Sequence, residues 1–100
     1  MQVQLNPNEV VIKACDSKFL ANPEAITGKL ILTNQRVFFT DPDTSTEDVS
    51  IWPSAIKEII HFSTGLFSKN GIQIVLKDGA DHRFTVKDRE SWTLLINRMY

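Results

Sequence analysis

The stretch GKLILTNQRVFF, residues 28–39, places two apolar runs on either side of a short polar segment. The runs, 30–32 and 37–39, are rich in branched aliphatic and aromatic residues. Runs of this kind, separated by so few residues, predict two antiparallel strands joined as a hairpin. A two-residue turn at Asn34-Gln35 predicts three facing pairs: Leu32 with Val37, Leu30 with Phe39, and Ile31 with Phe38. Gln35 suits a positive φ poorly, so a looser four-residue loop fits the sequence equally well.

Alternating apolar residues and turn signals extend this pattern along the chain. The clearest further hairpin has Asp78-Gly79 as its turn, between runs at 72–76 and 84–86. Residues 56–63 fit a helix or a strand, and their β-branched and aromatic content favours a strand. The strands that we expect span about 9–16, 26–33, 36–41, 49–52, 56–63, 71–77 and 82–87.

The spacing of the apolar residues changes near the C-terminus. Trp92, Leu95, Ile96 and Met99 recur at the spacing of one helix face, which predicts an amphipathic helix over about 89–99 with Asp88 as its N-cap. The predicted fold is therefore mainly β, a single domain over residues 1–100. Seven antiparallel strands would form a barrel or sandwich, capped by the C-terminal helix.

Composition narrows the classes of function. The chain has 100 residues, 42% of them hydrophobic, and a net charge of −1. Nucleic-acid-binding domains usually carry a basic excess, so we expect no nucleic-acid partner. The single cysteine, Cys15, excludes a disulfide within the chain and is expected to be a small core residue. No run is long enough to cross a bilayer and the N-terminus does not resemble a signal peptide, which predicts a cytoplasmic protein.

The sequence resembles the GRAM domain family, which has the pleckstrin-homology superfold. The hairpin 28–39 carries the resemblance. It is close to the family pattern G-x-L-x-L-T-N-x-R-Ω-x-F, in which Ω is an aromatic residue and x is any residue. Weaker matches are LNPNE at 5–9, IWPSAIKEI at 51–59, and KDG at 77–79 followed by HRFTV at 82–86. The resemblance covers nearly the whole chain. It implies a non-catalytic module that binds membrane lipids or proteins.

Pleckstrin-type lipid sites lie where the loops between strands one and two, three and four, and six and seven meet. Here those loops would be residues 16–25, 41–48 and 78–81, which contain eight acidic residues and Lys18 as the only basic residue. Such an acidic end should repel a phosphorylated headgroup. The alternative phosphoinositide site would use Lys18 with Lys13 and Lys29 on the first two strands.

The opposite end of the predicted barrel offers another candidate contact. Leu66 and Phe67 lie within the loop 65–71, and the nearby basic residues are Lys69, Arg36 and Lys57. An apolar pair with basic neighbours could enter a membrane interface or a groove on a partner protein. The alternative is that Phe67 folds back and caps the barrel.

No residue pattern indicates catalysis. His61 and His82 lie in predicted strands at spacings that match no catalytic motif, and we expect no cofactor and no metal. Trp52 and Trp92 are expected to pack in the core or against the helix. The predicted function is an adaptor for a protein partner or an anionic membrane surface. The alternatives are a phosphoinositide-binding module and a structural module that self-associates, so the oligomeric state is left open.

Overall fold

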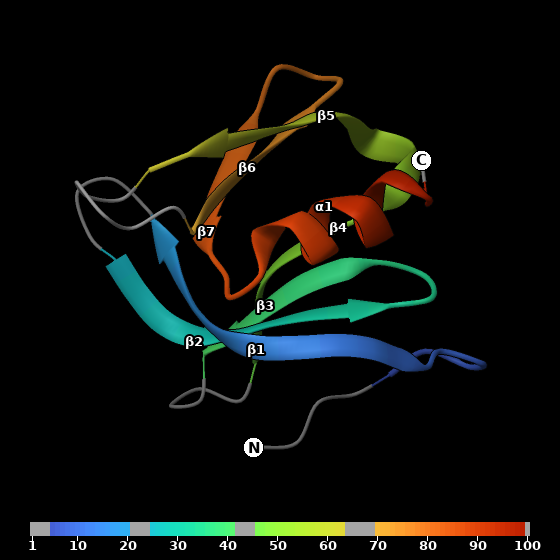
Figure 1. Ribbon diagram of the computed structural model, residues 1–100. Coiled ribbons are helices and arrows are strands. Elements are labelled where there is room, and N and C mark those ends of the chain that lie inside the picture. The colour runs from blue at the N-terminus through green and yellow to red at the C-terminus, as the bar shows by residue number, and fades with distance from the viewer. Residues whose placement is uncertain (1–4, 21–24, 42–45, 64–69, 100) are drawn as a thin grey trace.

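The computed structural model describes residues 5–20, 25–41, 46–63 and 70–99 (Figure 1). Seven strands, one short 3-10 helix and one α-helix follow one another along the chain. Their bounds are β1 (Val11–Leu20), β2 (Ala25–Thr33), β3 (Val37–Asp41), β4 (Thr46–Ile51), η1 (Pro53–Ala55), β5 (Ile56–Phe62), β6 (Gly71–Leu76), β7 (Asp81–Thr85) and α1 (Arg89–Asn97).

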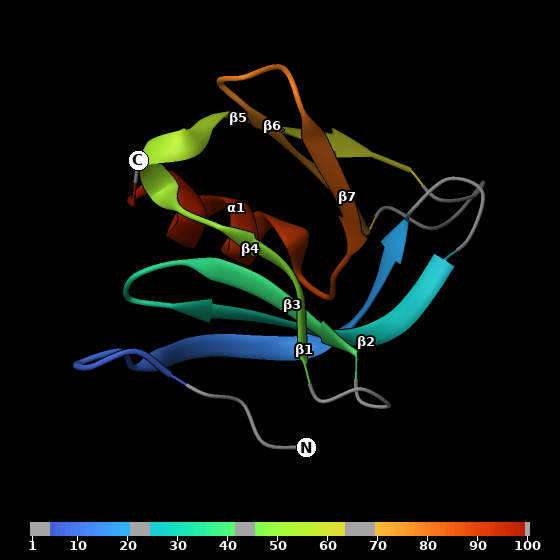
Figure 2. The ribbon, with the colours of Figure 1, turned by 180° about the vertical axis from the view of Figure 1, so that it is seen from behind.

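All seven strands form one antiparallel sheet with the order β4-β3-β2-β1-β7-β6-β5. The sheet bends over where β1 meets β7, so β1–β4 form one half and β5–β7 form the other (Figures 1 and 2). Helix α1 lies across the open side between the two halves. The predicted mainly β fold with a C-terminal helix is confirmed, and the ambiguous segment 56–63 is a strand.

The hairpin of β2 and β3 has the predicted register. Leu30 pairs with Phe39, Ile31 with Phe38, and Leu32 with Val37. The turn is closed by a hydrogen bond from Thr33 N to Arg36 O of 2.9 Å. Asn34 and Gln35 both have negative φ, so the turn does not require the conformation that Gln35 would resist.

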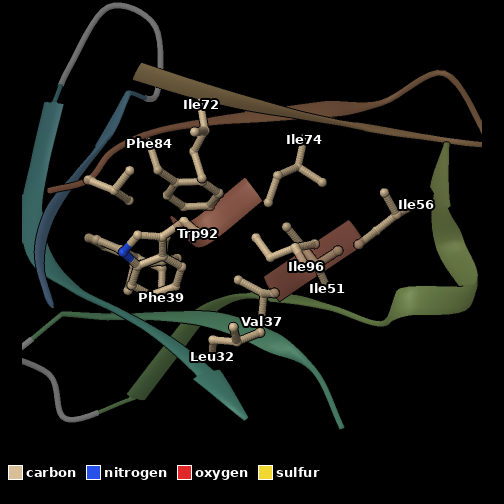
Figure 3. Packing of buried hydrophobic residues seen from close by; sticks show 12 residues of the cluster. Leu32, Val37, Phe39, Ile51, Ile56, Ile72, Ile74, Phe84, Trp92 and Ile96 are labelled. Carbon is tan, nitrogen blue, oxygen red and sulfur yellow. The ribbon is translucent and has the colours of Figure 1, made fainter. Parts of the chain in front are cut away.

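The core fills the space between the two halves of the sheet and the helix (Figure 3). Trp92 and Ile96 of α1 are fully buried, and the other two residues of the predicted helix stripe, Leu95 and Met99, pack against the core. Gly28 is required where the Phe39 ring crosses β2, because a Cβ there would collide with that ring and with Thr40 O.

Several boundaries and contacts differ from the sequence-based expectations. β1 continues to Leu20 instead of ending near residue 16, and β4 begins at Thr46 instead of 49. Asp88 has a left-handed conformation, with φ of 57°, and its side chain makes no capping hydrogen bond. Trp52 was expected to be packed, yet 47% of it is exposed.

In the described part of the chain, no helix has both the length and the apolar character required to cross a membrane.

Candidate functional site

A buried ion pair joins the N-terminal segment to the turn between β2 and β3. Arg36 donates from Nε to Glu9 Oε2 at 2.9 Å and from an Nη atom to Oε1 at 3.1 Å, which is bidentate geometry. Thr33 Oγ1 donates to Glu9 Oε2 at 2.6 Å, and Arg36 also reaches Ser50 Oγ at 3.3 Å. The exposed fractions of the two charged side chains are 5% for Arg36 and 0% for Glu9. We call Glu9, Thr33 and Arg36 the clamp.

The other two residues of the turn hold the same N-terminal segment by its backbone. Asn34 Oδ1 accepts from Val10 N at 2.8 Å, and Asn34 Nδ2 donates to Asn8 O at 3.0 Å. Gln35 Nε2 donates to Pro7 O at 2.9 Å. The polar sequence TNQR, residues 33–36, therefore fixes residues 7–10 against the hairpin, which is a structural role.

This arrangement corrects the expectation that Arg36 contributes charge to a surface contact. Its guanidinium group is buried against the Phe38 ring, with its Cζ 4.4 Å from the ring centroid, and its charge is neutralised by Glu9. The hydrogen bond from Arg36, assisted by those from Thr33 and the Asn6 backbone, outweighs burial and lowers the pKa of Glu9 to about 2.

The remaining members of that predicted contact are not brought together by the described residues. Leu66, Phe67 and Lys69 lie in the segment 64–69, outside the described residues. Lys57 is exposed near the start of β5, beside an irregularity in the pairing with β6 between Ile56 and Glu58. Lys57 is thus available to solvent, whereas Arg36 is not.

The three lysines of the alternative lipid site lie on two faces of the sheet. Lys13 pairs with the core residue Leu32, and its Nζ lies 5.9 Å from the ring centroid of Trp92, so it faces inward. Lys18 and Lys29 are exposed on the outer face. Residues 18 and 29 are diagonal neighbours across β1 and β2, because Lys18 pairs with Thr27. Lys13 therefore does not join the other two.

The meeting of β1 and β7 adds residues that the sequence pattern did not indicate. Phe19 pairs with Phe84, and their rings stack inside the barrel with centroids 5.4 Å apart. The residues beside them consequently face outward. Lys18 N donates to Thr85 Oγ1 at 2.9 Å, and Arg83 lies two positions away on the same face of β7. Lys18 is therefore flanked by a basic residue on each neighbouring strand.

We call Lys18, Lys29 and Arg83 the basic outer face; all three are exposed. Two carboxylates share this face. Asp16 is directly opposite Lys29, and Asp81 Oδ2 is 3.7 Å from Arg83 Nε. Both members of the Asp81–Arg83 pair are well exposed, so it contributes little stability and separates easily.

The predicted acidic end is not assembled as expected. The turn that follows β6 lies beside η1, because Lys77 N donates to Ala55 O at 2.9 Å. The sequence had assigned residues 78–81 and Lys57, which lies two residues after Ala55, to opposite ends of the barrel. Asp16, counted there as a loop residue, is within β1.

The histidines and the cysteine lie apart from one another in different packing environments. His61 Nε2 is 2.7 Å from Thr93 Oγ1 of α1. His82 packs against Phe19, and burial lowers the pKa of its imidazole. Cys15 is half-buried beside the core, and burial raises the pKa of its thiol, which disfavours the nucleophilic thiolate. No group of three or more metal-ligating side chains gathers within the described ranges.

Solved structures with the same arrangement identify the fold. The Vps36 N-terminal PH domain has a TM-score of 0.74 and 16% identity, over 96% of this chain and 82% of that chain. The chain has the pleckstrin-homology fold. The Slm1-PH domain, described as binding ligand in a non-canonical site, has a TM-score of 0.68 and 14% identity, over 89% of this chain and 96% of that chain.

A third similar structure is the C-terminal domain of an unknown protein from Leishmania infantum. It has a TM-score of 0.77 and 16% identity, over 93% of this chain and 86% of that chain. No protein-family model matches the sequence, and no curated protein matches it either.

Proposed function

We propose that this chain is a non-catalytic binding module of the GRAM type that contacts an anionic membrane surface from the cytoplasmic side. The observation that supports this function is the basic outer face, where three adjacent strands expose three cations beside two carboxylates. The module would act as an adaptor that holds a partner protein or domain at the membrane.

The spacing of the charges favours binding to an extended anionic surface over binding of a single lipid headgroup in a compact pocket. Each Lys or Arg close to an anionic leaflet contributes about 1 kcal/mol of attraction, so a few cations suffice for weak, reversible binding. The cations of the basic outer face are spread along β2, β1 and β7 and do not surround one point. Asp16 and Asp81 would further weaken a site for one multiply charged phosphate group.

A phosphoinositide headgroup is the second candidate ligand. Lys18 and Lys29 would hold it, now without Lys13, which faces the core side of the sheet. Slm1-PH has been solved in complex with inositol-4-phosphate and with phosphoserine, which supports a phosphate-binding role for this fold without assigning one to this chain.

Vesicle flotation tests the proposal with neutral vesicles, vesicles containing phosphatidylserine, and vesicles doped with a phosphoinositide. Lys18→Glu/Arg83→Glu should reduce binding to phosphatidylserine vesicles about thirtyfold or more, because two attractive charges become repulsive. Binding of the unmodified protein should also weaken as ionic strength rises.

The matched control is Lys57→Glu/Lys77→Glu, which changes the charge equally but beside η1. This control should retain most of the binding. Leu66→Asp/Phe67→Asp tests the segment that lies outside the described residues. Failure of the unmodified protein to bind any anionic vesicle would refute the membrane function. If only the control variant lost binding, or only the Leu66→Asp/Phe67→Asp variant did, the membrane contact would lie outside the basic outer face.

A further inference from the structure

Two apolar side chains of β5 border the basic outer face. Ile60 is 39% exposed, and Phe62 is half-buried but lies outside the core cluster that the described residues form. Ile60 pairs with Gln73 of β6, and Gln73 pairs with Arg83 of β7. Residues directly opposite one another share a face of a sheet, and so do residues two apart on one strand. Ile60 and Phe62, which we call the apolar pair, therefore lie on the same face as Arg83.

A glycine lets the Phe62 ring reach toward Arg83. Phe62 pairs with Gly71, and a Cβ on Gly71 would lie within 2.7 Å of three atoms of the ring. The ring therefore covers the Gly71 backbone, and its centroid lies 5.8 Å from Arg83 Cζ. Gly71 in turn pairs with Thr85, whose hydroxyl group accepts from Lys18 N at 2.9 Å. One continuous strip of the outer face thus joins the aromatic ring to two basic residues.

The acidic residues of these strands lie on one side of the apolar pair. Asp81 and Glu58 are the only acidic residues within β5, β6 and β7, and both pair with Val75. They consequently lie beyond Ile60, on the side away from Phe62. The part of the face around Phe62 therefore has no carboxylate from these three strands that would repel an anionic surface.

We propose that the apolar pair anchors the protein in an anionic bilayer by entering its interfacial layer beside Arg83. The inference rests on the proposed membrane function and names the side chains that would leave water. The sheet bends where β1 meets β7, and Arg83 and the apolar pair lie on the same side of that bend (Figure 1). One flat surface can therefore contact all three residues.

A bilayer suits both kinds of side chain at once. Its phosphate groups attract the guanidinium group of Arg83, a side chain that is 56% exposed, while the neighbouring Phe62 ring lies at the level of the headgroups. A soluble anion would neutralise Arg83 but would leave the apolar pair in water. Burial of Ile60 and Phe62 also adds an attraction that salt does not screen. Part of the binding should therefore persist at high ionic strength.

Flotation with phosphatidylserine vesicles tests the anchor. Ile60→Thr/Phe62→Thr keeps the net charge and the β-branched side chains that suit a strand. This variant should bind about tenfold more weakly than the unmodified protein and should lose the binding that persists at high salt, because less apolar surface leaves water. The matched control, Val11→Thr/Ile12→Thr, changes two exposed apolar residues at the start of β1 and should bind like the unmodified protein.

Urea unfolding checks that both variants fold. Ile60→Thr alone is the milder variant, with an expected loss of about threefold. In a second measurement, a nitroxide near the top of a lipid acyl chain should broaden the methyl resonances of Ile60 and leave those of Val11 sharp.

The outcomes separate the anchor from the membrane function. If the unmodified protein binds no anionic vesicle, both are refuted. If Lys18→Glu/Arg83→Glu abolishes binding but Ile60→Thr/Phe62→Thr binds like the unmodified protein, the membrane function stands and the anchor is overturned. An equal loss in the Val11→Thr/Ile12→Thr control would overturn the anchor as well.

Discussion

Glu9→Gln should lower the free energy of unfolding by about 3 kcal/mol or more, because it leaves the Arg36 guanidinium buried without its counter-charge. The lowered pKa of Glu9, from 4.5 to about 2, implies a similar magnitude. Denaturant unfolding at neutral pH measures this difference. The matched control is Glu58→Gln on β5, where the side chain is exposed and the change should cost about 0.5 kcal/mol or less.

The same ion pair predicts a pH dependence. The folded state holds the pKa of Glu9 below its unfolded value, so its contribution is complete above about pH 5 and is lost as the pH falls toward about 2. The Glu9→Gln variant lacks this contribution at every pH. The stability difference between the two proteins should therefore shrink in acid, and a difference that stays constant from pH 7 to pH 3 would contradict the ion pair.

Trp92→Ala should destabilise the fold by about 3–5 kcal/mol, which is the usual cost of emptying a fully buried aromatic site. Its Nε1 has no hydrogen-bond partner within the described residues, so the loss arises from packing, with a small contribution from the cation–π contact with Lys13. Trp52→Ala is the matched control, since this tryptophan is 47% exposed and its ring centroid lies 5.8 Å from Arg36 Cζ. Its cost should be about 1 kcal/mol or less.

Equal costs for the two tryptophan substitutions would contradict the assignment of Trp92 to the core and Trp52 to the surface. Unfolding of each variant by urea gives the comparison directly, and the slope of each transition shows whether the denatured state has changed.

The local sequence pattern was sufficient to predict the hairpin of β2 and β3 and the buried face of α1. The register of β2 and β3 followed from pairing like residues across one turn, and the spacing of Trp92 and Ile96 marked the buried face of the helix. β1 was predicted to end near residue 16, whereas the strand continues to Leu20. The extra residues are held in the strand by tertiary contacts, since Phe19 packs against Phe39 and Phe84. β4 was also predicted too short, because its polar first residues resemble a loop.

The candidate site depended on contacts between residues far apart in the sequence. Arg36 was read as a surface cation because nothing near it in sequence neutralises it; its partner, Glu9, lies 27 residues earlier. Arg83 was overlooked because its position beside Lys18 is set by the single pairing of Phe19 with Phe84. The first contact joins two separate matches to the family, LNPNE and the hairpin that contains TNQR, but neither match indicated that they touch, and no sequence signal marked the second contact.

Nuclear magnetic resonance during titration with phosphatidylserine bicelles tests the membrane-binding face most directly. The account predicts that backbone amide shifts concentrate at residues 16–18, 27–29 and 83–85, which surround the basic outer face. Shifts confined to residues 53–58 and 77–80, or to residues 64–69, would contradict it and place the membrane contact on another part of the barrel.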